Sequence, residues 1–73
     1  MNFEKALTLL KNGKYITRKG WNGKGMYLFL YTDGGFIDDY EIQNFILLKT
    51  VNDTVIPWIA SQSDILAEDW EVK

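Results

Sequence analysis

The sequence predicts an α+β domain: a small, mainly antiparallel sheet with one helix at the N-terminus and a short helix near the C-terminus. Three observations predict it. Apolar residues of the opening segment lie at helical spacing, short β-rich runs with turn-length connections follow, and a second helix start comes after these runs. At 73 residues the chain is long enough for one domain, which takes in residues 1–73.

The first helix starts after Asn2, which is a good N-cap residue. Asn12-Gly13 ends it, because glycine readily adopts the left-handed conformation found at helix C-termini. The apolar residues between these points are three, four or seven positions apart and gather on one face: Phe3, Ala6, Leu7 and Leu10.

Four β-rich runs follow the helix: residues 15–18, 26–31, 45–50 and 54–56. The first two are joined by a turn-like stretch, residues 19–25, which carries three glycines. Asn52-Asp53 suits a tight turn between the last two runs. Residues 36–44 are acidic and ambiguous, and we expect a loop or a poorly formed strand there. Pro57 cannot donate to a central ladder, so the strand beside it belongs at a sheet edge or bulges there.

Near the C-terminus, Ser61 and Asp64 match a capping box before Ile65, and predict a helix of one or two turns. Trp70 and Val72 alternate with charged residues, which predicts a final strand with Trp70 in the core. The predicted order of elements is therefore α-β-β-β-β-α-β.

Residues 26–31 are apolar on both sides of a strand. Successive side chains point to opposite faces, which separates two sets: Met26, Leu28 and Leu30 from Tyr27, Phe29 and Tyr31. A sheet with one solvated face would instead alternate apolar and polar residues. The N-terminal helix can cover one face, so we expect a homo-oligomer to cover the other. The alternative is that the short second helix and the loops cover it.

The composition excludes several classes of function. The chain has neither cysteine nor histidine, which removes disulfides, thiolate metal sites and histidine-dependent nucleophiles, and no metal site is predicted. A net charge of −2 argues against a duplex nucleic acid as partner. The longest apolar run, residues 26–31, is too short to span a membrane, and the start of the chain does not resemble a secretory signal. We therefore expect a cytoplasmic protein without a membrane partner.

The glycine-rich segment 20–25 matches neither the P-loop nor the dinucleotide-binding fingerprint, so its spacing alone favours a hairpin with solvated lysines. Trp21 within it either staples the loop to the core, which is the commoner case, or stacks on a planar ligand. The same two alternatives hold for Trp58. Residues 61–64 either cap the second helix or also meet a ligand's anionic groups and hydroxyls.

No pair among the ten acidic residues has a spacing that indicates an acid/base couple. The weakest hypothesis is a small hydrolase that acts through Asp64, Glu68 or Asp69. It predicts a carboxylate with a raised pKa that faces a pocket.

Two segments resemble the signatures of a known family. Residues 18–26 resemble the R-x-G-W-N-G-K core of a small phage and prophage family, and residues 55–70 resemble its second signature. Residues 3–11 are similar to the first helix of that family. On these motifs the chain resembles, over nearly its whole length, the second family of Thoeris anti-defence proteins.

The resemblance implies a binding protein and not an enzyme. Members act as sponges: they bind cyclic nucleotide immune signals, notably glycocyclic ADP-ribose isomers, and hold them without cleavage or cofactor. It also implies a homo-oligomer, typically a tetramer, with ligand pockets between protomers, in the cytoplasm of the host bacterial cell. The alternative is a protein-interaction module of a phage or prophage that uses exposed tryptophans, Trp21 and Trp58.

The family motifs place a ligand site on nine residues of this chain: Arg18, Trp21, Asn22, Lys24, Met26, Trp58, Ser61, Gln62 and Asp64. The resemblance implies that the two tryptophans form apolar walls and that Asn22 bonds polar edges of the ligand. Arg18 and Lys24 would offset the charge of the pyrophosphate, and residues 61–64 would meet ribose hydroxyls. Many relatives carry a longer, proline-containing insertion after the strand at 26–31. Here the segment at residues 32–44 is short and acidic, which predicts that the protein binds a different signal or binds the signal more weakly.

Overall fold

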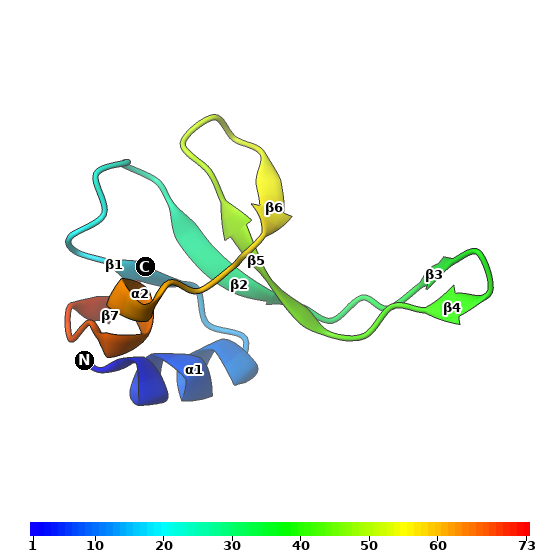
Figure 1. The fold of residues 1–73 in the computed structure, drawn as a ribbon, viewed down its shortest axis with the longest axis horizontal. Coiled ribbons are helices and arrows are strands. Elements are labelled where there is room, and N and C mark those ends of the chain that lie inside the picture. The colour runs from blue at the N-terminus through cyan, green and yellow to red at the C-terminus, as the bar shows by residue number, and fades with distance from the viewer.

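The computed structural model describes residues 1–73. The elements, in chain order, are α1 (Phe3–Lys11), β1 (Ile16–Arg18), β2 (Tyr27–Tyr31), β3 (Phe36–Ile37), β4 (Tyr40–Glu41), β5 (Phe45–Lys49), β6 (Val55–Pro57), α2 (Gln62–Leu66) and β7 (Trp70–Val72). Five strands form one antiparallel sheet in the order β6-β5-β2-β1-β7, and β3 and β4 form a separate hairpin (Figure 1). The predicted α+β class, both helices and the final strand are confirmed.

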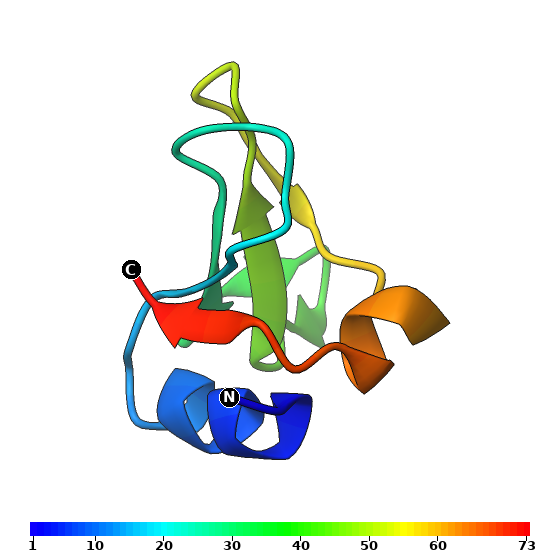
Figure 2. The ribbon, with the colours of Figure 1, turned by 90° about the vertical axis from the view of Figure 1, so that its left-hand side faces the viewer.

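The N-terminal helix α1 has the ends that its sequence predicts. The side chain of Asn2 accepts a hydrogen bond of 2.9 Å from the backbone N–H of Lys5, and Gly13 follows the helix with φ +85°. α1 packs against β1, β2 and β7, and Figure 2 shows it lying under β7. The fully buried core lies between this helix and the sheet: Ala6, Leu10, Ile16, Leu28 and Trp70.

The central pair of strands, β2 and β5, has apolar side chains on both faces. Leu28 pairs with Leu48, and this face belongs to the core under α1. The opposite face, which we call the outer face, carries Tyr27, Phe29, Tyr31, Phe45 and Leu47. On it the ring of Tyr15 stacks on Tyr27 at 5.0 Å. The second helix α2 packs against α1, so neither helix covers the outer face.

Residues 36–44 form more regular structure than predicted. Phe36 pairs with Glu41 and Ile37 with Tyr40, in a hairpin that lies at the opposite end of the molecule from the helices (Figure 1). The turn is possible because Asp38 adopts a left-handed φ of 54°, which aspartate tolerates better than most residues. The hairpin has no buried face and therefore leaves no apolar-polar alternation in the sequence from which to predict it.

The C-terminal third follows the prediction closely. β6 is an edge strand, so Pro57 removes no interior ladder bond. The predicted capping box is present, with Ser61 Oγ accepting from the Asp64 N–H at 3.0 Å. No helix in the structure has the length and apolar character that a membrane crossing requires.

Candidate ligand pocket

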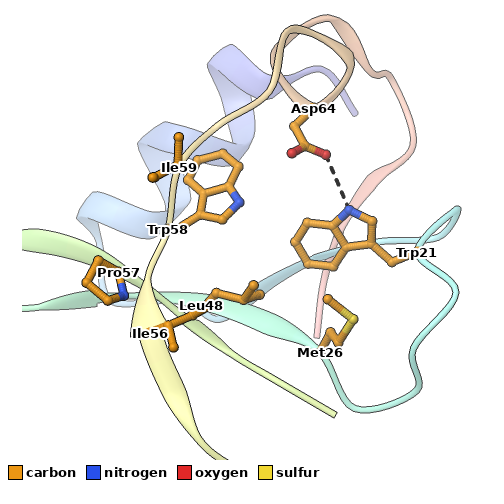
Figure 3. A pocket seen from close by; sticks show the side chains of 8 residues that line it. All are labelled: Trp21, Met26, Leu48, Ile56, Pro57, Trp58, Ile59 and Asp64. Carbon is orange, nitrogen blue, oxygen red and sulfur yellow. Dashed lines mark hydrogen bonds between the residues drawn. The ribbon is translucent and has the colours of Figure 1, made fainter.

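A pocket of about 350 Å³ lies between the loop at 19–25, strands β5 and β6, and the segment that leads into α2. Most of the lining is hydrophobic. Eight residues line the pocket: Trp21, Met26, Leu48, Ile56, Pro57, Trp58, Ile59 and Asp64. Figure 3 shows Trp21 and Trp58 on opposite sides of the opening, with Asp64 between them at one end. This volume is at the lower end of the ~300–1,000 Å³ typical of ligand sites, and suits a part such as a base or a sugar.

Trp21 is held by a tight turn after β1. Its backbone N–H donates to the carbonyl of Arg18 at 3.2 Å, and its ring packs edge-on against Trp70 with centroids 5.4 Å apart. Gly20 makes this possible, because its N–H donates to Asp69 Oδ2 at 2.8 Å and a Cβ there would lie 2.7 Å from that oxygen. Trp21 therefore staples the loop to the core and lines the pocket as well.

Met26 lines the pocket at the end of the glycine-rich loop. Thr17 Oγ1 donates to the carbonyl of Met26 at 2.7 Å, which ties the end of the loop to β1. A Cβ on Gly23 would collide with the side chains of Val51 and Met26. The glycine thus lets the loop lie directly on the turn between β5 and β6 and fixes the Met26 thioether beneath Trp21.

Trp58 stands at the end of the edge strand. Its backbone N–H donates to the carbonyl of Ile46 at 3.0 Å, and its ring lies 5.7 Å from Phe3 and 6.1 Å from Trp70. Its indole Nε1–H makes no hydrogen bond within the protein. In Figure 3 this nitrogen points toward the space between the two pocket tryptophans. Trp58 thus brings both an aromatic face and an unused donor to the pocket.

Asp64 is the only charged residue of the pocket lining. Its Oδ1 accepts from Arg18 Nη1 at 2.8 Å and from Trp21 Nε1 at 3.3 Å, and its Oδ2 accepts from the Ser61 N–H at 3.4 Å. Burial raises the pKa of Asp64, but the hydrogen bonds from Arg18, Ser61 and Trp21 together outweigh it and hold the pKa below its ordinary value. The carboxylate is therefore ionised at neutral pH.

Arg18 binds two carboxylates. Besides Asp64 it contacts Asp69, with Nε donating to Oδ1 at 2.8 Å. The hydrogen bonds to Asp69 and Asp64 raise the pKa of Arg18, and the hydrogen bond from Arg18 lowers the pKa of Asp69. The charge of Arg18 is thus balanced by two carboxylates inside the protein, and its contact with a pyrophosphate stays a prediction. The lowered pKa values of Asp64 and Asp69 are the opposite of the raised value that a hydrolase acting through either residue would need.

The structure brings four of the nine expected site residues to the pocket lining: Trp21, Met26, Trp58 and Asp64. Arg18 and Ser61 lie behind it and hold Asp64. Asn22, Lys24 and Gln62 are exposed and outside the lining.

Four residues of the pocket lining were not predicted from the sequence: Leu48, Ile56, Pro57 and Ile59. Leu48 and Ile56 pair across the predicted β5–β6 hairpin. That register, together with the alternation of side chains between the two faces in residues 26–31, could have predicted that Leu48 and Ile56 lie on the same face as Met26. The structure has no cluster of three acidic residues that could hold a metal ion.

Comparison with known proteins agrees with the two sequence signatures. The model of the Thoeris anti-defense 2-like domain matches residues 1–73. The chain belongs to this family. One relative, Thoeris anti-defense 2 of Bacillus phage SP01, is 39% identical over 83 aligned positions, which cover 99% of this chain and 93% of that protein. Because 83 positions exceed 73 residues by ten, that member of the family carries insertions that this one lacks.

The pocket lies between the two segments that resemble the signatures of the family. The loop at 19–25 belongs to the first signature that the sequence shows, and residues 55–64 belong to the second. Pocket residues from both segments face each other across the opening in Figure 3. The family resemblance and the pocket geometry therefore point to the same part of the molecule.

Proposed function

We propose that the protein binds a cyclic nucleotide immune signal of the glycocyclic ADP-ribose type and sequesters it unchanged, which blocks Thoeris defence. Membership of the Thoeris anti-defense 2-like family supports the anti-defence role. The observation that carries ligand binding is the pocket between Trp21 and Trp58. Two indole faces suit the stacking of a planar base.

Sequestration needs affinity and no chemistry, and the lining of the pocket supports this proposal. Its only charged lining residue is an ionised aspartate that already accepts three hydrogen bonds. The phosphates of the ligand would lie outside it, toward the exposed loop lysines Lys19 and Lys24, neither of which pairs with a carboxylate. The site we propose thus separates an apolar base pocket from a basic rim.

We also propose that the protein works as a homo-oligomer, with a tetramer expected from the family resemblance. The chain exposes 5435 Å² of surface, compared with about 4,700 Å² for a compact monomer of its mass. Exposed apolar side chains of the β3–β4 hairpin, Phe36, Ile37 and Tyr40, are part of this surface. A second copy would cover the outer face, which lies on the opposite side of the sheet from the pocket residues Leu48 and Ile56. The site of action would be the cytoplasm of the host cell.

Calorimetric titration with glycocyclic ADP-ribose tests the proposal. We expect binding at micromolar ligand or below, and recovery of intact ligand after the complex is heated and the protein removed. A Trp58→Ala variant should lose binding, whereas Leu66→Ala, an exposed position in α2, should retain it. Absence of binding would overturn ligand capture, and recovery of degraded ligand would overturn sequestration.

A second candidate is a protein-interaction module, which the β3–β4 hairpin favours. Phe36, Ile37 and Tyr40 are 71%, 67% and 77% exposed at the far end of the molecule from the pocket. Replacing all three by serine distinguishes the candidates. Loss of Thoeris inhibition with unchanged nucleotide affinity would favour the interaction module, whereas retained inhibition would favour sequestration by the pocket.

A further inference from the structure

We infer that Asn22 and Gly23 form a site of spontaneous self-modification, at which Asn22 converts to aspartate and isoaspartate and the loop at 19–25 loses its packing. The modification itself goes beyond the proposed function, and only its effect on ligand affinity rests on that function. The inference follows from an Asn-Gly pair in this loop and from hydrogen bonds that the pair does not make.

The chain carries two Asn-Gly pairs, at residues 12–13 and 22–23, and a lysine follows each of them. Asparagine is a thermolabile residue. A following glycine has no side chain to hinder attack by its main-chain nitrogen on the asparagine side chain. The other asparagines each precede a residue with a larger side chain: Asn2, Asn44 and Asn52. The two pairs are therefore the reactive candidates, and their matched sequences make each a control for the other.

The structure separates the two pairs. The Gly13 N–H donates to the carbonyl of Leu10 at 3.0 Å, which ties this nitrogen to the end of α1. The Gly23 N–H donates to no group of the protein, and the Asn22 side chain is exposed and makes no hydrogen bond. The nitrogen and the side-chain carbon that must meet are therefore both free only at residues 22–23.

The reaction needs water and no other reactant. The main-chain nitrogen of Gly23 gives its proton to water or hydroxide and attacks Cγ of Asn22. The bond from Cγ to Nδ2 breaks as the cyclic imide closes, and the amide nitrogen takes up a proton and leaves as ammonia. Water then opens the imide. Cleavage between the Gly23 nitrogen and Cγ gives aspartate, whereas cleavage at the main-chain carbonyl gives isoaspartate.

Isoaspartate changes the loop because it adds a carbon atom to the main chain just before Gly23. The loop is close-packed there, since even a Cβ on Gly23 would collide with Val51 and Met26. Figure 3 shows Trp21 and Met26 near the two ends of this loop, where both line the pocket. Both products also add a negative charge to the loop toward which the proposed function directs the ligand's phosphates, and like charges repel.

Mass spectrometry of the folded protein, incubated at neutral and at mildly alkaline pH, tests the inference. Fragmentation of the intact chain locates the exchange of an NH₂ group for an OH group. We expect Asn22 to convert at least about fivefold faster than Asn12, because attack at residues 12–13 must first break the hydrogen bond of Gly13. Conversion should be faster at the higher pH, since the attacking nitrogen loses its proton. In urea-unfolded protein the two sites should react at equal rates.

Two variants check the assignment. Asn22→Gln should suppress the fast conversion, because its longer side chain closes a larger and less favourable ring. Asn12→Gln is the matched control and should leave the conversion of Asn22 unchanged. If Asn22→Gln does not fold, the ratio of the two rates in the unaltered protein still decides the inference.

The modified protein carries an additional negative charge and can be separated by anion exchange. Without ligand, the indole N–H resonance of Trp21 should be shifted, because movement of the loop disturbs its hydrogen bond to Asp64. In calorimetric titration the modified protein should bind glycocyclic ADP-ribose at least about tenfold more weakly than fresh protein.

The outcomes distinguish this inference from the proposed function. Equal rates at Asn22 and Asn12 in the folded protein, or no conversion of Asn22, would overturn the modification site. An unshifted Trp21 resonance in the modified protein would overturn its effect on the loop. Failure of fresh protein to bind glycocyclic ADP-ribose would overturn the proposed function, whereas the mass and resonance measurements, which use no ligand, would still decide the inference.

Discussion

At the scale of single residues, Asp64 connects three segments that are distant in the sequence. It caps α2 through Ser61, binds the guanidinium of Arg18 from β1, and fixes the indole of Trp21. Arg18 in turn holds Asp69, which accepts from the Gly20 N–H. The wall of the pocket is therefore set by ionic hydrogen bonds that a change in pH can break.

We expect acid to destabilise the protein through this group of residues. Asp64 and Asp69 have pKa values lowered from the ordinary 3.8. Their contribution to the free energy of unfolding is present above pH 3.8, where the unfolded carboxylates also ionise, and is lost as pH falls through the lower folded values. Thermal unfolding between pH 7 and pH 2 measures it.

Arg18→Met is the control for this pH dependence. It should lower the melting temperature at pH 7, because two partly buried carboxylates lose their partner. The difference from the unaltered protein should shrink toward pH 2. An equal difference at all pH values would show that Arg18 stabilises the fold by packing alone.

A substitution at Ile59 best separates an effect on ligand affinity from an effect on the stability of the fold. Ile59 lines the pocket and yet is 89% exposed, so Ile59→Ala should change the free energy of unfolding by less than about 0.5 kcal/mol. Ligand affinity should fall about five- to tenfold, because the bound ligand would bury this side chain. Calorimetry and thermal unfolding measure the two effects, with Leu66→Ala as the control. Unchanged affinity would place the ligand elsewhere.

A substitution at Trp21 cannot separate ligand affinity from stability in this way. The sequence led us to expect that Trp21→Ala would weaken binding far more than it lowers the melting temperature. In the structure its ring packs on Trp70 and donates to Asp64. Removal of such a large, half-buried ring costs stability as well, so damage to both properties would not argue against a binding role.

At the scale of elements, the glycine-rich loop is a close-packed segment that sets the depth of the pocket. Gly20 admits the Asp69 carboxylate and Gly23 admits Val51 and Met26. Close packing within the protein therefore accounts for glycine at these two positions, and a phosphate-binding role is not needed to explain them.

Gly23→Ala tests this role of the loop. The added methyl group has no room beside Val51 and Met26, and we expect a loss of about 1–3 kcal/mol in the free energy of unfolding. Displacement of Met26 should weaken ligand binding at the same time. Lys24→Ala, in the same loop but exposed, should change stability by less than about 0.5 kcal/mol. Equal stability of the two variants would contradict the close packing.

At the scale of the whole molecule, the core is thin. Five of 73 residues are buried, and all five lie on the helix side of the sheet. The outer face retains a row of aromatic side chains, with Tyr15 and Lys73 packed against Tyr27. Burial of this face against another copy would add the apolar contact that the single chain lacks.

Light scattering after size-exclusion chromatography tests the oligomer, and Phe29→Glu is the variant to use. Phe29 lies in the middle of the outer face, opposite Leu47. A carboxylate there should shift the protein toward monomers, because an unpaired charge would be buried between copies. Leu66→Glu, on exposed α2, adds the same charge and should leave the oligomer intact. A single chain of 8.5 kDa as the unaltered species would overturn the proposal.

Much of the fold could be predicted from the sequence, because the signals concerned are local. The periodicity of α1, the capping box at Ser61 and the edge position of Pro57 depend on neighbouring residues and backbone chemistry. The two family signatures are local in the same sense, and the family that they indicated was confirmed over the whole chain. The β3–β4 hairpin escaped prediction because it has no buried face.

The partners of Arg18 and Asp64 were decided only by the tertiary structure. The family resemblance implied that Arg18 and Asp64 both bind the ligand, and the sequence also predicted Asp64 as a helix cap. The two residues are 46 positions apart in the sequence. Long-range pairing of β1 with β7 brings Asp69 beside Arg18, and the chain then places α2 over both. Charges that meet in this way neutralise each other before any ligand arrives. Local sequence determines which groups exist, but their free hydrogen-bonding capacity depends on contacts that form only when the chain folds.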